Sequence, residues 1–503
     1  MQPLSVKDKS SYRKWLVNMH WLDHTILDIH QALVKKTVTP LQLVEEALRR
    51  AKADAWNTFE KTTEALAIQQ AKALTTPEVN NPFWGIPFVI KDNFSTQGIE
   101  TTAGSNILNG YIPLFDATVY QKLIQAKAIL IGKTTLDELA MGGTGMTGHK
   151  GYQYNPFDAS KTRQIGGSSS GSAAAVSGGM VPFSLGSDTG DSVRKPASYA
   201  GLVGFKPTWG RISRYGLFPF APSLDHVAYF TRSVEDASIL TNLLSGPDTN
   251  DATSSTQPLP VYHFSQSIRG KKIAVIHEVM DSIQNPIILQ RFKQTLEALT
   301  KAGAQVDYVH FPLALLQAIY PTYMTISCAE ATSNNANLDG LKFGPGYQGK
   351  TYQDVMMQAR TAGFSELIKR RFVIGSFVLM KENQQDLFLR AQRVRRMIVE
   401  NLQQLYQTYD VIYLPAAPTI APKFTDSSDR LSSQYLIADS HLALGNFAGL
   451  PSVTIPIGFE QNMPFGANIM GRAFEEATTL EVAYVVEQFT GLKNLSILTR
   501  KPS

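Results

Sequence analysis

Residues 166–196 concentrate the side chains of this sequence that could perform nucleophilic chemistry. The stretch GGSSSGSAAAVSGGMVPFSLGSDTGDSVRKP interleaves serine and glycine with apolar residues, which favours close packing in a core over a flexible linker. Serines held there must form hydrogen bonds, so they either bond to the backbone or serve a nucleophilic site. In Thr189-Gly190-Asp191-Ser192, successive N–H groups around a glycine could form an anion-binding nest. A serine in such a nest could attack a carbonyl whose oxyanion the nest receives.

A serine nucleophile needs a base, and here the candidate is a lysine. None of the nine histidines lies near these motifs in the sequence, although folding could bring one close. A neutral lysine can replace histidine if burial lowers its pKa from ~10.4 to near 7, at a cost on the order of 4 kcal/mol. Lys91 follows the apolar run IPFVI and has the most buried context among the lysines, so we predict that it is the base.

Four short patterns match well-known sites, but their context argues against each. Residues 143–148 (GTGMTG) fit a dinucleotide-binding fingerprint but follow a helix-like segment, and residues 132–134 (GKT) lack the earlier glycine of a phosphate-binding loop. His20 and His24 have the spacing of metal ligands without an evident third ligand. Ser169 stands in a G-x-S-x-G pattern, which should follow an apolar strand, whereas the residues before it are polar. We therefore expect no metal site and no Ser-His-Asp hydrolase centred on Ser169.

Alternating helices and short apolar strands are expected to position these residues. Such alternation predicts an α/β fold with a mixed, largely buried sheet. One predicted strand ends at Lys91, and three others cover residues 128–131, 271–276 and 410–414. The predicted helices begin after Pro40, after Asp116 as a cap, and after Ser233.

Two longer segments complete the predicted organisation. Residues 384–406 should form one amphipathic helix, and its second face, which carries three arginines, is interpreted as solvated rather than as an RNA contact. The apolar residues of that helix are Leu387, Ala391, Val394, Ile398 and Leu402, and the arginines are Arg390, Arg393 and Arg396. The polar run from residue 247 to 260 is interpreted as a surface loop rather than a domain boundary.

Composition limits the class of protein. With 503 residues, of which 43% are hydrophobic and 18% charged, the chain can bury a sizeable core, and general disorder is excluded. A net charge of +5 over this length does not indicate nucleic-acid binding. The single cysteine, Cys328, cannot form an internal disulfide, and no apolar stretch is long enough to cross a membrane. We expect a soluble, cytoplasmic protein.

Taken together, these motifs resemble the amidase signature family. GIPFVIKDN, GGSS and GSDTGDSVRKP occur in the family's order, and the resemblance runs from about residue 22 to about residue 492. It implies a large mixed central β-sheet covered by helices on both faces. The implied division is an N-terminal helical segment over residues 1–75, a catalytic domain over 76–492 with a helical excursion at about 345–410, and a tail over 493–503.

The resemblance also implies roles for individual residues. Lys91 would be the base, Ser168 a bridging serine after a cis peptide bond, and Ser192 the nucleophile. The oxyanion hole would be made by the N–H groups of Thr189, Gly190, Asp191 and Ser192. Asp188 and Arg194 match positions that help to hold the site together, and Asp191 and Ser170 stand where the family usually has glycine.

Longer stretches, among them TTAGSNIL, GFKPTWGRISRYGL and NFAGLPSVTIPIG, resemble the A subunits of aspartyl/glutamyl-tRNA amidotransferases within this family. By that resemblance Arg371, or its neighbour Arg370, holds the α-carboxylate of glutamine, and Asp439 holds its α-amino group. The chain would be a glutaminase subunit that supplies ammonia to a B subunit, while a small C subunit wraps around it. ATP and Mg²⁺ are expected in the B subunit, which would also bind the tRNA, and no cofactor is expected in this chain.

Two other functions remain open at this stage. The chain could be a stand-alone amidase of the same family, which acts on other amides. It could also be a catalytically weak scaffold subunit, and Asp191 in the nucleophile loop motivates this alternative.

Overall fold

A computed structural model describes residues 20–426 and 432–500. Residues 1–19 of the expected N-terminal segment, and residues 501–503 of the expected tail, lie outside the described residues. One 11-stranded sheet runs through the molecule in the order β1-β3-β2-β4-β6-β5-β10-β11-β9-β7-β8. Its strands are β1 (Phe59–Thr62), β2 (Pro87–Lys91), β3 (Ile129–Thr134), β4 (Phe183–Asp188), β5 (Val203–Lys206), β6 (His226–Thr231), β7 (Lys272–Ile276), β8 (Gln305–Val309), β9 (Val411–Pro415), β10 (Ser452–Glu460) and β11 (Met463–Gly471).

The sheet is mixed, as the sequence predicts. β2 is parallel to both β3 and β4, and β7 is parallel to β8 and β9, whereas the strands between these groups pair antiparallel. Because one sheet continues on both sides of the polar run at 247–260, that run is a surface loop, as expected. The predicted strands at 128–131, 271–276 and 410–414 correspond to β3, β7 and β9.

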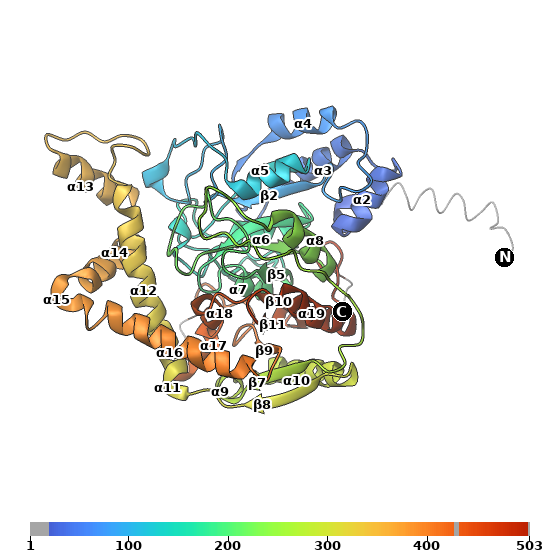
Figure 1. Ribbon diagram of the computed structural model, residues 1–503. Helices are drawn as coiled ribbons and strands as arrows, with labels where there is room; N and C mark the ends of the chain where they lie inside the picture. Colours follow the sequence, from blue (N-terminus) through green and yellow to red (C-terminus); the bar gives the residue numbers. More distant parts are fainter. Residues whose placement is uncertain (1–19, 427–431, 501–503) are drawn as a thin grey trace.

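Helices cover both faces of this sheet (Figure 1). Two glycines of β11 that are five residues apart show the two faces, since successive side chains of a strand point in opposite directions. A Cβ on Gly466 would meet Ser198 of α7, whereas a Cβ on Gly471 would meet Thr479 of α19. The helices are α2 (Ile26–Val34), α3 (Pro40–Lys52), α4 (Glu64–Ala73), α5 (Thr118–Gln125), α6 (Ser170–Ser177), α7 (Arg194–Ala200), α8 (Val234–Leu244), α9 (His277–Ser282), α10 (Pro286–Lys301), α11 (Leu313–Gln317), α12 (Ile319–Asn334), α13 (Tyr352–Gly363), α14 (Glu366–Leu379), α15 (Lys381–Gln384), α16 (Phe388–Tyr406), α17 (Ser433–Ser440), α18 (Ala443–Phe447) and α19 (Glu476–Thr490), with short 3-10 helices at Trp21–Asp23, Asn106–Leu108, Glu138–Ala140 and Asn335–Asn337.

Two helix starts form as their sequences predict, and a third differs. Thr39 caps α3 in a capping box with Gln42, and Ser233 caps α8 by accepting the N–H of Asp236. Asp116, in contrast, does not cap α5. The residue before that helix is Ala117, and the Asp116 carboxylate accepts the N–H of Gln97 instead.

The N-terminal segment is not only helical. Residues 59–62 form β1, which pairs antiparallel with β3 at the edge of the sheet. Its sequence, FEKT, is short and mostly polar, so hydrophobic alternation does not reveal it.

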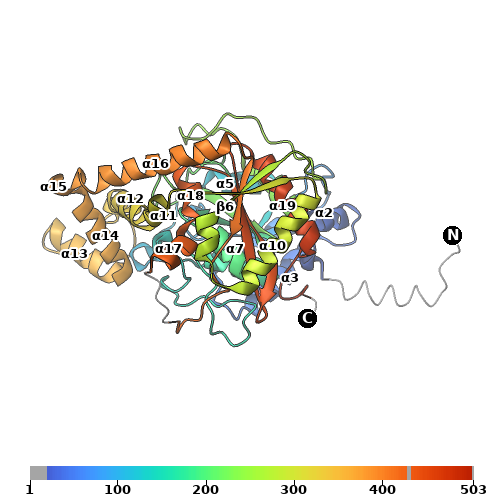
Figure 2. The same cartoon turned by 90° about the horizontal axis from the view of Figure 1, so that it is seen from below.

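The helical excursion projects from one side of the body (Figure 1). α13 to α16 build it together with α12, which packs against α14, and α16 reaches back from α15 to the body (Figure 2). The amphipathic helix predicted from residue 384 is interrupted, because α15 ends at Gln384 and α16 begins at Phe388. Gln385 and Leu387 keep dihedral angles close to the helical region, so the apolar spacing continues through the break and cannot reveal it.

The two ends of the described chain meet at one buried arginine. The Arg232 guanidinium donates to the carbonyl oxygens of Leu22 and His24 near the start, and to the Asn494 side chain near the end. The segment from residue 493 onward therefore packs on the body as far as the structure describes it. Leu495 is buried, and the N–H of Ile497 donates to the carbonyl oxygen of Ser177.

Candidate active site

Lys91 ends β2 in the interior of the sheet. Every residue of β2 is buried, since β3 and β4 flank its two edges and helices α3 and α6 pack against it. The Lys91 Nζ lies 2.8 Å from the Ser168 Oγ and 2.9 Å from the Ser187 Oγ. Ser187 on β4 also accepts from Asn93, and the sequence gives no sign of its contact with Lys91.

Burial makes Lys91 a much weaker base than a free lysine. Loss of solvent lowers the pKa of Lys91 to about 7, and the charges of Asp137, Asp188 and Asp225 oppose this effect only in part. Lys133 on the neighbouring strand is equally buried, but it forms an ion pair of 2.9 Å with Asp92. Lys91 forms no such pair with any carboxylate that the structure describes. A substantial neutral fraction at neutral pH follows, which is the state that a base requires.

The peptide bond between Gly167 and Ser168 is cis, as the family resemblance implies. A side chain at Gly167 would collide with the Asp137 carboxylate. That carboxylate accepts the backbone N–H groups of Thr144, Gly145, Met146 and Thr147. The loop at residues 143–148, whose sequence fits a dinucleotide-binding fingerprint, thus directs its N–H groups at the Asp137 carboxylate.

The loop from Thr189 to Ser192 follows β4 directly and leads into α7. Val193 and Arg194 donate their N–H groups to the Asp188 carboxylate, whereas those of Gly190, Asp191 and Ser192 have no acceptor among the residues described. Asp191 does not adopt a positive φ, so replacing the family's usual glycine causes no strain of that kind. The loop can therefore direct several free donors at one oxyanion.

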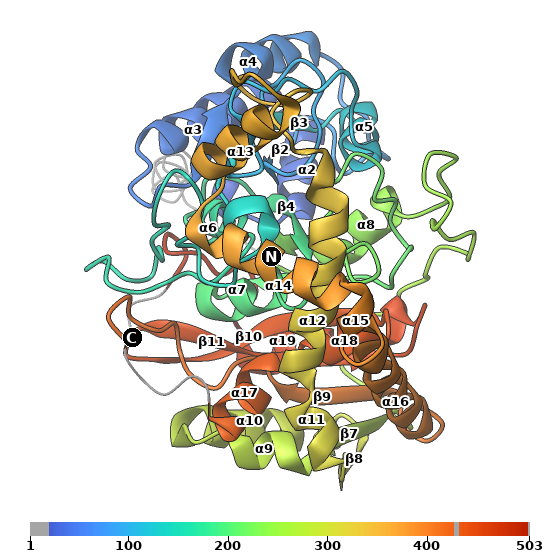
Figure 3. The same cartoon turned by 90° about the vertical axis from the view of Figure 1, so that its left-hand side faces the viewer.

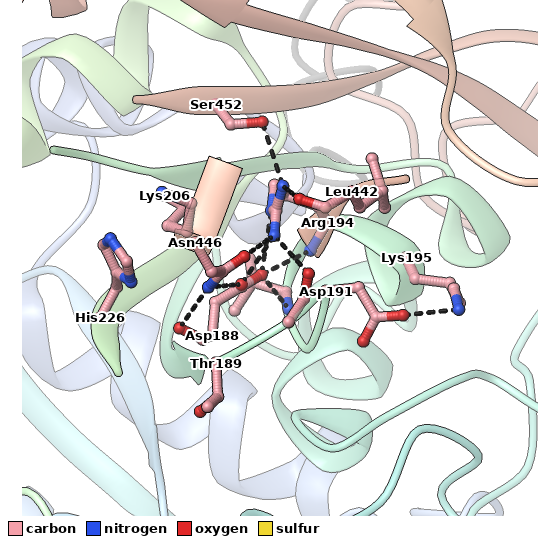
Figure 4. Close-up of polar contacts among 12 residues, drawn as sticks. Asp188, Thr189, Asp191, Arg194, Lys195, Lys206, His226, Leu442, Asn446 and Ser452 are labelled. Carbon is pink, nitrogen blue, oxygen red and sulfur yellow. Dashed lines mark hydrogen bonds and ion pairs between the residues drawn. The ribbon is translucent and has the colours of Figure 1, made fainter. Parts of the chain in front are cut away.

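A buried ion pair holds this loop (Figure 4). The Arg194 Nη2 lies 2.9 Å from the Asp188 Oδ1, and both side chains are fully buried. Arg194 also donates to the Gly190 carbonyl and to Asn446, and Asn446 donates back to Asp188. Burial alone would raise the pKa of Asp188, but the charge and hydrogen bonds of Arg194 hold it well below its ordinary value.

We expect Arg194→Met to lower the free energy of unfolding by about 3–5 kcal/mol, because Asp188 would remain buried without its partner. Urea unfolding followed by circular dichroism measures this change. Arg396→Met is the matched control. Arg396 is 80% exposed and pairs with Glu400 on the same helix, so its loss should cost no more than ~1 kcal/mol. Equal losses in the two variants would contradict a structural role for the buried pair.

A small cavity of about 170 Å³ opens beside the nucleophile loop. Figure 3 shows α12 and α14, which supply part of its wall, in front of the body. Its lining includes Gly190 and Asp191 from the loop, Arg371 from α14 and Asp439 from α17. The volume is below the ~300–1,000 Å³ of sites for drug-sized ligands, and it suits a substrate the size of an amino acid.

Charged side chains of both signs line this cavity. Arg371 lines the cavity while its neighbour Arg370 is exposed, which distinguishes the two candidates. The Nε and Nη1 atoms of Arg371 are buried and have no hydrogen-bond partner within the described chain. Buried donors of this kind call for an anionic ligand. Asp439 is 27% exposed and lies 3.1 Å from the Lys195 Nζ, a residue that sequence reasoning missed.

The remaining motifs have structural explanations. The Ser169 hydroxyl donates to the Ser187 carbonyl and accepts its N–H, so Ser169 braces β4. His20 lies 3.4 Å from Glu46 at the surface. Within residues 20–426 and 432–500, no group of three or more histidine, cysteine or acidic side chains could hold a metal ion, and no helix is long and apolar enough to cross a membrane.

Comparison with known proteins shows the family of this chain. The family model described as Amidase matches residues 42–480. The A subunit of the glutamyl-tRNA(Gln) amidotransferase from Pediococcus pentosaceus is 38% identical over 94% of this chain and 98% of its own length. The corresponding protein of Geobacillus thermodenitrificans is 39% identical over the same shares.

The solved structure of a relative has a similar fold. The crystal structure of the corresponding A subunit from Thermotoga maritima has a TM-score of 0.79 at 34% identity, covering 97% of this chain and 99% of that one. The mixed sheet with helices on both faces is therefore the fold of these proteins. The chain belongs to the amidase signature family, and within it to the group that contains the glutamyl-tRNA(Gln) amidotransferase A subunits.

Proposed function

We propose that this chain is the glutaminase subunit of a tRNA-dependent amidotransferase. The observation that carries the proposal is the buried Lys91 Nζ, 2.8 Å from the Ser168 Oγ, beside the loop that bears Ser192. Neutral Lys91 accepts a proton from Ser168, and Ser168 accepts the proton of Ser192 as Ser192 attacks the side-chain amide carbon of glutamine. The N–H groups of the loop from Thr189 to Ser192 stabilise the oxyanion.

Collapse of the tetrahedral intermediate breaks the carbon–nitrogen bond. The proton on Lys91 returns through Ser168 to the leaving nitrogen, which departs as ammonia and leaves a glutamyl ester on Ser192. Water then attacks this ester with the same base, which releases glutamate and restores the Ser192 hydroxyl.

The charges of the cavity support glutamine as the substrate. A free amino acid carries one anion and one cation at its α-carbon. The buried donors of Arg371 suit the carboxylate, since a guanidinium forms two parallel hydrogen bonds to it. The carboxylate of Asp439 suits the ammonium group. A pocket for purely apolar amides would need neither residue.

The names of the relatives support an assembly with further subunits. We propose that ammonia passes to a B subunit, which binds the tRNA and uses ATP and Mg²⁺ to activate the carboxylate of Glu-tRNA(Gln) or Asp-tRNA(Asn). A small C subunit would wrap around this chain. Because charged tRNA is made and consumed in the cytoplasm, we propose that location for the assembly.

Co-expression with neighbouring genes, purification through this chain and an ammonia assay test the proposal together. We expect two co-purifying partners and glutamine hydrolysis that charged tRNA and ATP stimulate. Hydrolysis of aliphatic or aryl amides by the isolated chain, without glutamine turnover, would instead identify a stand-alone amidase. Glutamine-dependent activity that persists in an assembly with Ser192→Ala would identify a scaffold subunit.

Arg371→Met is expected to raise the KM for glutamine by about 10–100-fold, because charge-assisted hydrogen bonds contribute about 1.5–3 kcal/mol. Steady-state ammonia release at varied glutamine concentration measures the effect. Arg370→Met removes the same charge from the exposed neighbour and should leave the KM within about twofold. If the two variants have the same KM, Arg371 does not bind the substrate.

A further inference from the structure

Three charged side chains form a chain of ion pairs along the wall of the cavity. The Lys195 Nζ lies 2.5 Å from the Asp191 Oδ2 and 3.1 Å from the Asp439 Oδ1. Lys195 is 9% exposed, so these carboxylates replace most of its solvent, and Figure 4 shows its pair with Asp191. All three residues line the cavity.

The position of Lys195 is not explained by local helix stability. Lys195 is in the first turn of α7, where the helix dipole disfavours a cation. Arg194 precedes it, so two cations stand at the same helix start. Arg194 is balanced by Asp188, whereas Lys195 is balanced only by residues of the cavity.

The negative charge of Asp191 is unfavourable in its own position. Its backbone belongs to the loop whose free N–H groups are proposed to stabilise the oxyanion, and its side chain adds a negative charge to that loop. A negative charge beside a developing oxyanion raises the barrier that the loop is built to lower. Lys195 removes this conflict, because an ammonium 2.5 Å from the carboxylate neutralises it.

The balance of the three charges also sets the net charge of the wall that would receive the α-ammonium group of the substrate. Two carboxylates against one ammonium leave a single net negative charge, which is what the α-ammonium of an amino acid requires. Without Lys195 the wall would carry two negative charges, and without Asp191 it would carry none.

We propose that Asp191 and Lys195 are a compensated pair, in which Lys195 is a positioning residue. Lys195 screens the oxyanion loop from Asp191, and Asp191 keeps Lys195 from neutralising Asp439. The pair therefore sets both the rate of acyl transfer to Ser192 and the selectivity for substrates with a free α-ammonium group. This inference deepens the proposed function, and its selectivity component rests on that function.

A double-variant cycle in the assembled enzyme tests the pair. Lys195→Gln should lower kcat about 10–100-fold, because Asp191 would then act on the oxyanion unscreened. Asp191→Asn should raise the KM for glutamine about 10-fold with a smaller change in kcat, because Lys195 would then cancel Asp439. The double variant restores a single net negative charge and should recover at least 10-fold of the kcat lost in Lys195→Gln. Lys369→Gln, which removes a partly exposed lysine paired with Glu366 on α14, is the control with unchanged kinetics.

A second readout separates this inference from the proposed function. The rate at which a fluorophosphonate labels Ser192, measured by mass spectrometry, depends on the oxyanion loop but not on glutamine recognition. Labelling should be slow in Lys195→Gln and restored in the double variant, even if the wild-type assembly does not hydrolyse glutamine. The proposal would be overturned if kcat of the double variant falls by the product of the two single-variant factors. It would also be overturned if Ser192 of Lys195→Gln is labelled at the wild-type rate. Thermal unfolding of each variant excludes loss of fold as the cause.

Discussion

Ser192→Ala is expected to lower kcat for glutamine hydrolysis by about 10⁴-fold or more while the fold is retained. The expected size follows from the chemistry, because without the hydroxyl no glutamyl ester forms, and loss of a nucleophile typically removes most of the rate enhancement. Ser192 is almost fully buried in a loop held by Asp188 and Arg194, so removing one oxygen leaves the loop in place. Ammonia release by the purified assembly measures the loss.

The matched control for this variant is Ser177→Ala. Ser177 is also buried, at the end of α6, and its hydroxyl donates to the Ala173 carbonyl within the helix. Its loss should lower stability by ~1 kcal/mol and leave kcat within a few-fold. Similar residual activity in the two variants would exclude Ser192 as the nucleophile and would favour a scaffold role.

Lys91→Met is expected to lower kcat/KM by about 10²–10⁴-fold at pH 8, because general-base catalysis of Ser192 is lost. In the wild-type enzyme kcat/KM should rise with pH and level off above a midpoint near 7, where burial places the pKa of Lys91. Lys91→Arg should be inactive over the whole range, since a guanidinium stays protonated. A wild-type profile without this limb, or an active Lys91→Met enzyme, would remove Lys91 from the mechanism.

Stability should depend on pH through the same residue. The pKa of Lys91 is about 7 when folded and near its ordinary value of 10.5 when unfolded. Between these values the unfolded chain binds more protons, so the free energy of unfolding rises with pH, by roughly 4–5 kcal/mol across the interval. Lys91→Met lacks this contribution. Its stability relative to wild type should therefore be greatest below pH 7 and decline towards pH 10, as measured by urea unfolding.

Local sequence is enough to place the chemical groups. The apolar run before Lys91 identifies it as the buried lysine, whereas the cis bond before Ser168 is implied only by the resemblance of the GGSS stretch to the family. The start of α3 follows from Thr39 and Pro40. For Lys91 and for the start of α3, a pattern of a few neighbouring residues contains the signal.

Other features depend on contacts between distant residues. β4 lies in a glycine- and serine-rich stretch, and the hydroxyl of its Ser187 accepts from Lys91 and Asn93, which lie more than 90 residues earlier in the chain. Lys195 meets Asp439 across more than two hundred residues of chain, so no spacing rule links them. Such pairings emerge only when the sheet and the helices around it have assembled.

The bracing of both chain ends by Arg232 has a practical consequence. Since Asn494 and the carbonyl oxygens of Leu22 and His24 share one guanidinium, deletion of residues from 494 onward would also deprive the first helical turns of an anchor. Proteases should then cut near residue 24 of the shortened protein sooner than in the intact one. Because residues 22–24 and Asn494 meet at one side chain, a linker over Arg232 could join them in a circular permutant with new ends in the loop at 247–260.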